Sequence, residues 1–144
     1  MMIQEIVDQE LMLALIIRSG YSAEGIQFFT PDQFSQQLAY MHHPAGKKID
    51  AHRHVPMARN VELTQEVLIV RKGRLRVDFY RDEHTYLESH ILGAGDVILL
   101  AHGGHGFKVL EELEMIEVKQ GPYCGPAEKT RFSPVPEEQV RIVS

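Results

Sequence analysis

The sequence predicts a single all-β domain, built as a sandwich or barrel of short strands. The length of 144 residues is typical of one domain and allows an apolar core that needs no disulfide. Apolar residues make up 44% of the chain, as in ordinary globular proteins. Short apolar or alternating runs recur at roughly 8–12-residue spacing with turn signals between them, which is typical of sandwiches and barrels.

The N-terminal part contains three candidate strands. Residues 11–17 are apolar throughout, but a membrane-spanning helix needs about 20 such residues, so we expect a buried strand. Acidic residues around this run also argue against a secretory leader. Residues 25–30 and 37–41 are the next two candidates. Pro31 and the Pro44–Gly46 stretch predict turns, because proline presets the backbone angle that a turn requires.

The central part predicts six further strands. In order, they are residues 66–71, 74–80, 85–92, 97–100, 107–110 and 115–118. Residues 74–80 alternate between polar and apolar side chains, which predicts a half-buried strand. We expect turns at Lys72-Gly73 and at the acidic run 111–114. The proline-rich residues 121–144 are expected to wrap the surface, with one edge strand at 139–143.

Charge and cysteine content exclude several classes of protein. The formal net charge of −5 argues against a nucleic-acid-binding domain, which is usually basic, and against binding to an anionic membrane. The single cysteine, Cys124, rules out an intramolecular disulfide and a cysteine-rich zinc site. We expect an inert thiol at this position, because no activating base or helix start adjoins it. A reducing, cytoplasmic location fits this composition.

Eight histidines are the unusual feature of the composition. His52 and His54 are two residues apart, so on a strand both rings project from the same face and can converge on one ion. Glu66 begins an apolar run and can supply an oxygen ligand. His105 lies in the run His102-Gly103-Gly104-His105-Gly106, where glycines allow the backbone to bend a ring back into a barrel mouth. Imidazole and carboxylate together suit a first-row divalent metal.

These residues occur in a pattern that resembles the two motifs of the cupin superfamily. The first motif matches Gly46, five residues, His52-x-His54, and then Glu66, six residues and Gly73. The second matches Gly95, five residues, Ala101 in place of proline, then Gly103 and His105. Eleven residues separate His54 from Glu66, where the motif has three or four, and His105 arrives one residue early. The motif region covers residues 46–110 of a single domain, 1–144.

The resemblance implies a cupin-type double-stranded β-helix, which is a jelly-roll barrel. It also implies one divalent transition metal (iron, manganese, nickel or zinc) on His52, His54, Glu66 and His105. The early position of His105 leaves His102 as an alternative last ligand, and we favour His105 because Gly103 precedes it as in the motif. Of the remaining candidates, Gln65 and Tyr40 are possible donors behind the ligands. Lys129 and Arg131 are candidates for holding an anionic substrate group.

Within this resemblance, the expected activity is that of a metal-dependent oxygenase or of a sugar isomerase or epimerase, acting on a small carbohydrate or organic acid. No catalytic residue outside the ligand set can be identified from the sequence. One alternative is a non-catalytic domain that binds or senses a small ligand. Another is a metal-free sugar isomerase in which histidines act as acid and base. We expect a homodimer, because the strand at residues 11–17 offers an edge that a second subunit can cover.

Overall fold

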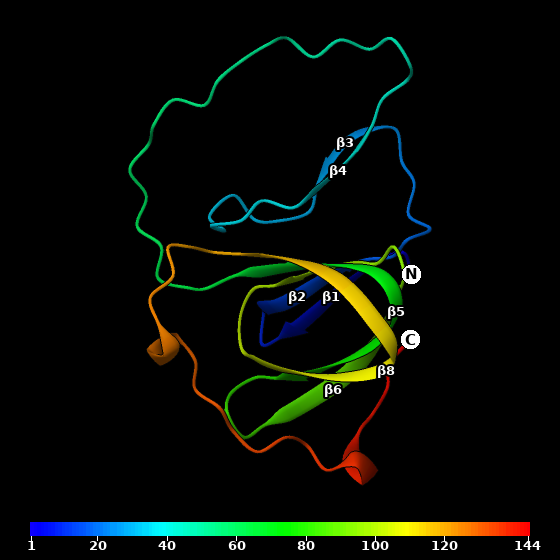
Figure 1. Cartoon of the computed structure of the whole chain (residues 1–144), viewed down its shortest axis with the longest axis vertical. Coiled ribbons are helices and arrows are strands. Elements are labelled where there is room, and N and C mark those ends of the chain that lie inside the picture. Colours follow the sequence, from blue (N-terminus) through cyan, green and yellow to red (C-terminus); the bar gives the residue numbers. More distant parts are fainter.

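The computed structural model describes residues 1–144 and shows an all-β chain whose main sheet is curled into a half-barrel (Figure 1). The strands are β1 (Ile3–Asp8), β2 (Leu11–Ile17), β3 (Gly25–Phe28), β4 (Ala39–His42), β5 (Glu66–Tyr80), β6 (Tyr86–Gly93), β7 (Val97–Leu100) and β8 (Gly104–Lys119). Two short 3-10 helices follow, η1 (Pro126–Glu128) and η2 (Glu137–Gln139). Neither they nor any other part of the structure forms a helix long and apolar enough to cross a membrane.

Strand β5 is the centre of the main sheet. The sheet has the order β1-β2-β7-β5-β6, and β8 pairs with the other edge of β5. Along the first edge, residues 66–69 of β5 pair with β7 and residues 74–80 pair with β6. Along the second edge, β8 pairs with β5 over its whole length. β3 and β4 form a separate two-stranded sheet.

The main sheet buries apolar side chains on both faces. The face that bears Leu68, Leu75 and Phe79, called the inner face here, holds a cluster of 12 buried residues. Because residues from both halves of β5 meet in this one cluster, the inner face is the concave side of the half-barrel. The outer face holds a smaller cluster that includes Val67 and Leu99, and the aromatic and apolar side chains around β3 and β4 pack against it.

Several expected elements are confirmed. β2 occupies residues 11–17, as the apolar run predicts, and β7 occupies residues 97–100. β3, β4 and β6 lie within one or two residues of their predicted bounds. The strand at residues 3–8 was not expected from the sequence, because its residues do not alternate between apolar and polar and its buried positions include the polar Gln4.

Two predicted turns are wrong. Residues 66–71 and 74–80 form the one strand β5, and residues 107–110 and 115–118 belong to the one strand β8. The chain passes Lys72-Gly73 and the acidic run 111–114 through shifts in the β5–β8 register rather than through turns. Cross-strand pairing explains the result, since Lys72 Nζ lies 2.7 Å from a Glu112 carboxylate oxygen and Arg74 lies 3.4 Å from that of Glu111.

Gly73 is the residue that permits this irregularity. Its φ angle is +88°, and a Cβ atom there would collide with the backbone carbonyl of Glu112. We expect Gly73→Ala to lower the free energy of unfolding by more than about 2 kcal/mol. Alanine is strained at this positive φ angle, and its Cβ atom would also push the Glu112 carbonyl out of place. Gly46→Ala is the control, because Gly46 has φ +84° but no atom near its Cβ position. An equal loss in both variants, measured by urea unfolding, would contradict this explanation.

The free edge that was expected at residues 11–17 does not exist. β2 pairs with β1 on one side and with β7 on the other, so neither of its edges is open to a second subunit. The apolar character of residues 11–17 is explained instead by burial, since Leu13, Leu15 and Ile16 have almost no exposed surface. The reason that was given for a homodimer is therefore wrong, and the homodimer itself stays a prediction.

The C-terminal segment wraps the surface, as expected, but it is held by an ion pair between the buried Arg76 and the exposed Glu137 and not by an edge strand. Residues 139–143 contain the end of η2 and a single bridge between Ser89 and Ile142. Arg76 Nε donates to Asp78 at 2.8 Å, and Arg76 Nη1 donates to Glu137 of η2 at 2.8 Å. The prediction that residues 74–80 form a half-buried strand is therefore wrong, because the C-terminal segment covers the polar side chains of Arg76 and Asp78.

Acid is expected to loosen this attachment. The bonds from Arg76 and Lys108 lower the pKa of Glu137 from 4.5 to about 2. Because the folded-state pKa is depressed, the contribution of Glu137 to stability is complete above pH 4.5 and is lost as the pH falls toward 2. The melting temperature of Glu137→Gln should therefore fall less over this range than that of wild type. Glu138→Gln, which alters the adjacent unpaired carboxylate, should behave as wild type.

Candidate metal and ligand site

The curl of the sheet brings Glu66 and His105 together. Glu66 begins β5 and pairs with Lys119, whereas His105 pairs with Phe79 near the far end of β5. In a flat sheet, 13 residues of strand would separate these two positions by about 43 Å. In the half-barrel, His105 Nε2 lies 3.6 Å from Glu66 Oε2. The two side chains that the sequence placed in one site are therefore neighbours, although they come from opposite ends of the same strand pair.

Burial shifts both groups toward their neutral forms. Burial raises the pKa of Glu66, and the Glu117 carboxylate raises it further against the opposite effect of Lys129. Burial lowers the pKa of His105, and Lys129 lowers it further. A neutral imidazole is the form that binds a metal, and a buried carboxylate next to a second carboxylate is stabilised in its charged form by a cation.

A cleft of about 610 Å³ opens onto these two side chains. Its second wall is the segment that follows β8, which contributes Lys129, Arg131 and Phe132. Phe132 lies so close to Gly104 that a Cβ atom there would be 2.8 Å from the ring. Gly104 therefore allows the ring of Phe132 to pack directly against the backbone of β8.

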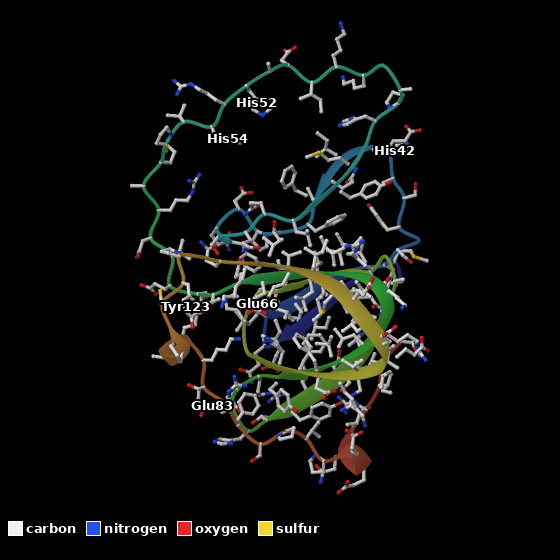
Figure 2. All side chains as sticks on the ribbon, viewed as in Figure 1. His42, His52, His54, Glu66, Glu83 and Tyr123 are labelled. Atoms are coloured by element: carbon white, nitrogen blue, oxygen red, sulfur yellow. The ribbon has the colours of Figure 1, made fainter.

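His52 and His54 lie elsewhere in the structure (Figure 2). They belong to residues 44–64, called the histidine segment here, which are all exposed and contain no helix or strand. The two rings are 5.6 Å apart between centroids, but the strand that was expected to carry them on one face is not formed. The structure does not bring the pair to Glu66 and His105, and it contains no group of three or more potential metal-ligating side chains. The complete four-ligand set stays a prediction.

His102, the alternative last ligand, points away from Glu66. Its Nδ1 lies 2.9 Å from the carbonyl oxygen of Met12, and its ring packs edge-on against Phe34. His102 and Gln65 line a different cavity of about 670 Å³ on the outer side of the sheet. Of the two histidines that the motif left open, the structure thus places His105 beside Glu66. Gln65, which was considered a donor behind the ligands, instead accepts hydrogen bonds from Ser35 and Gln36.

The other candidates from the sequence are distributed as follows. Tyr40 packs edge-on against Tyr21, away from the cleft. Cys124 is exposed. His90 is buried on β6 and lies 2.9 Å from a Glu88 carboxylate oxygen.

Sequence analysis missed Glu117 and Phe132 as neighbours of the site. Glu117 was not considered because it lies within an apolar run, but in β8 it points to the same face as Glu66, since it pairs with Leu68. Phe132 lies in the proline-rich tail and has no periodic signal. One sequence pattern could have identified Glu117: residues 115, 117 and 119 occupy every second position of a strand and therefore share one face. No pattern identifies Phe132.

Comparison with known proteins identifies no relative of this chain. No protein-family model matches the chain, and neither a curated protein nor a solved structure matches it. The half-barrel and the pairing of Glu66 with His105 are therefore the structural observations that bear on the cupin resemblance.

Proposed function

We propose that this chain is a small metal-binding cupin that holds one divalent transition metal on His52, His54, Glu66 and His105. The meeting of Glu66 and His105 in an open cleft is the observation that carries the proposal. The two side chains have suitable donor atoms and are separated by 39 positions in the sequence, and the curl of the sheet places both of them in the same cleft.

The donor atoms fit a first-row metal. Three imidazoles and one carboxylate suit iron, manganese, nickel or zinc, and they leave two positions open in an octahedral site. Glu66 and His105 already lie side by side in the cleft. For His52 and His54 to join them, either the histidine segment moves to the cleft or another chain supplies the two histidines. When bound, the metal would supply Lewis-acid polarisation of a substrate oxygen or a binding position for dioxygen.

The cleft favours an acidic small molecule. Lys129 and Arg131 both line it, and Lys129 is close enough to affect the pKa values of Glu66 and His105. A carboxylate or phosphate group can pair with these cations while a neighbouring oxygen of the same molecule faces the metal. Between the two substrate classes expected from the sequence, an organic acid thus fits better than an uncharged carbohydrate.

The proposed activity is that of an oxygenase or an isomerase, and a non-catalytic binding domain is the second candidate. A specific observation favours the second candidate: the other carboxylate that lines the cleft is engaged. Glu128 pairs with Lys119 at 2.6 Å. Incubation with a panel of small organic acids separates the two candidates, since only an enzyme converts a bound acid into product.

Elemental analysis tests the metal directly. Wild-type protein purified without chelators is expected to contain near-stoichiometric metal, and His52→Ala/His54→Ala is expected to lose it, because half of the ligand set is removed. His84→Ala is the control, since His84 lies at an exposed hairpin tip. Wild-type protein that carries no metal, and takes none up when iron, manganese, nickel or zinc is added, would contradict the proposal.

A further inference from the structure

Strand β8 has an edge and two apolar surfaces that nothing in the chain covers. It is a 16-residue strand that pairs only with β5, so the backbone groups along its other edge have no partner. Phe107 and Val109 are exposed on its inner face, and Ile116 and Val118 are exposed on its outer face. A long, apolar, unpaired edge strand is a template for pairing with another strand.

The histidine segment has the sequence pattern of a strand, but it pairs with no strand in the structure. From Ile49 to Leu63, odd positions carry most of the large apolar side chains, while His52 and His54 occupy even positions. This period of two is the pattern of a strand with one apolar face. Val55 is 64% exposed and Met57 is 66% exposed, so the apolar face is covered by nothing in the single chain.

The charges of the two elements are opposite. The histidine segment has four basic and two acidic residues, and therefore a net charge of +2. Strand β8 has two basic and four acidic residues, and a net charge of −2. Opposite net charges on two unpaired apolar elements favour their association.

The histidine segment extends away from its own half-barrel. In Figure 1 it forms an arc beyond β3 and β4, so that this hairpin lies between the arc and the main sheet. The hairpin region packs on the outer face, whereas Glu66 and His105 pair on the inner side. An arc that projects from one molecule is placed to reach the open β8 edge of another molecule.

We propose that the histidine segment of one copy pairs with the free edge of β8 in a second copy, reciprocally in a two-fold dimer. Each copy then brings its His52 and His54 to the Glu66 and His105 of its partner, so that each metal site contains residues from both chains. Reciprocal exchange closes the assembly, because the same two surfaces are used twice. The metal part of this inference rests on the proposed function, but the docking part does not.

The docking part can be tested without a metal. Sedimentation in the presence of a chelator should give a dimer of twice the 16.4 kDa chain mass. Val109→Lys should give a monomer, because it places a charge at a 55% exposed apolar position of the proposed interface. Val7→Lys is the control, since Val7 is 46% exposed on β1, outside the interface. A monomeric wild type, or a Val109→Lys variant that is still dimeric, would overturn the proposal.

Cross-linking identifies the chain that supplies the segment. A photoreactive benzoylphenylalanine replaces Val55, and ¹⁴N-labelled and ¹⁵N-labelled proteins are mixed, unfolded and refolded together. We expect cross-links from residue 55 to β8 that join peptides of different isotope content. Cross-links to β8 that only ever join peptides of the same isotope content would show that the segment folds onto its own β8, which would overturn the exchange but leave the proposed metal function intact.

Complementation tests the shared site. Neither His52→Ala/His54→Ala nor Glu66→Ala/His105→Ala should bind metal alone. A mixed dimer, isolated through two different affinity tags, should regain one metal site, because one copy supplies the histidine pair and the other supplies Glu66 and His105. Metal-free mixed dimers, alongside metal-loaded wild type, would overturn the shared site. A wild type that binds no metal but shows mixed-isotope cross-links would instead overturn the proposed function alone.

Discussion

Replacing Arg76 with Met is expected to lower the free energy of unfolding by about 3–5 kcal/mol, because the change leaves a buried carboxylate without its cation. Arg76 donates to both oxygens of Asp78, at 2.8 and 3.0 Å, and Asp78 is only 4% exposed. The same guanidinium holds Glu137, so the variant also releases η2 from the sheet. Urea unfolding followed by circular dichroism measures this loss.

Arg74→Met is the matched control for this prediction. Arg74 lies two residues earlier on the same strand and also faces a carboxylate, that of Glu111, but both side chains are about half exposed. An exposed ion pair contributes only about 0–1 kcal/mol, so a small change is expected. A second variant, Arg76→Met/Asp78→Asn, should recover part of the loss, because it removes the unpaired charge. Equal losses in Arg76→Met and Arg74→Met would show that burial of the pair has no role.

Replacing His105 with Ala is expected to weaken metal binding by more than about 100-fold, since even residues behind the ligands typically contribute 10-fold to 100-fold. His105 is the only histidine that the structure places beside Glu66. Titration of the chelator-treated protein with Zn²⁺ or Mn²⁺ measures the affinity. The circular dichroism spectrum should not change, because the His105 ring faces the cleft and is not part of the apolar core.

His102→Ala separates the role of a ligand from that of a nearby histidine. His102 lies in the same glycine-rich run, but it bonds with the carbonyl of Met12 and lines the other cavity. We expect its replacement to change the metal affinity by less than about threefold, because it supplies no ligand. The reverse ranking of the two variants would show that the motif alignment is shifted and that His102 is the ligand.

The local sequence predicts those buried strands that consist of a continuous run of apolar residues. The apolar runs of β2 and β7 and the turn at Pro44–Gly46 need no knowledge of distant contacts. The continuity of β5 and β8 could not be predicted in this way, because an acidic run such as 111–114 favours a turn when considered alone. In the structure, the basic side chains of Lys72 and Arg74 on the adjacent strand stabilise it as a strand.

In the candidate site, too, some features follow from local sequence and others depend on distant contacts. Motif spacing selects Glu66 and His105, and the curl of the sheet explains why these residues meet. The wall formed by Lys129, Arg131 and Phe132 depends on how the tail returns to β8, which no local pattern encodes. The structure leaves His52 and His54 in an exposed segment without a strand partner. The local spacing keeps the two rings near each other, but it does not identify which part of the fold they contact.

Anomalous diffraction from crystals grown with the bound metal tests the central claim most directly. We expect one peak per chain, about 2.0–2.2 Å from nitrogens of His52, His54 and His105 and from an oxygen of Glu66. The map also shows whether the two histidines of the pair come from the same chain or from its partner. A peak that Glu66 and His105 do not contact, or the absence of any peak in crystals soaked with all four candidate metals, would contradict the account.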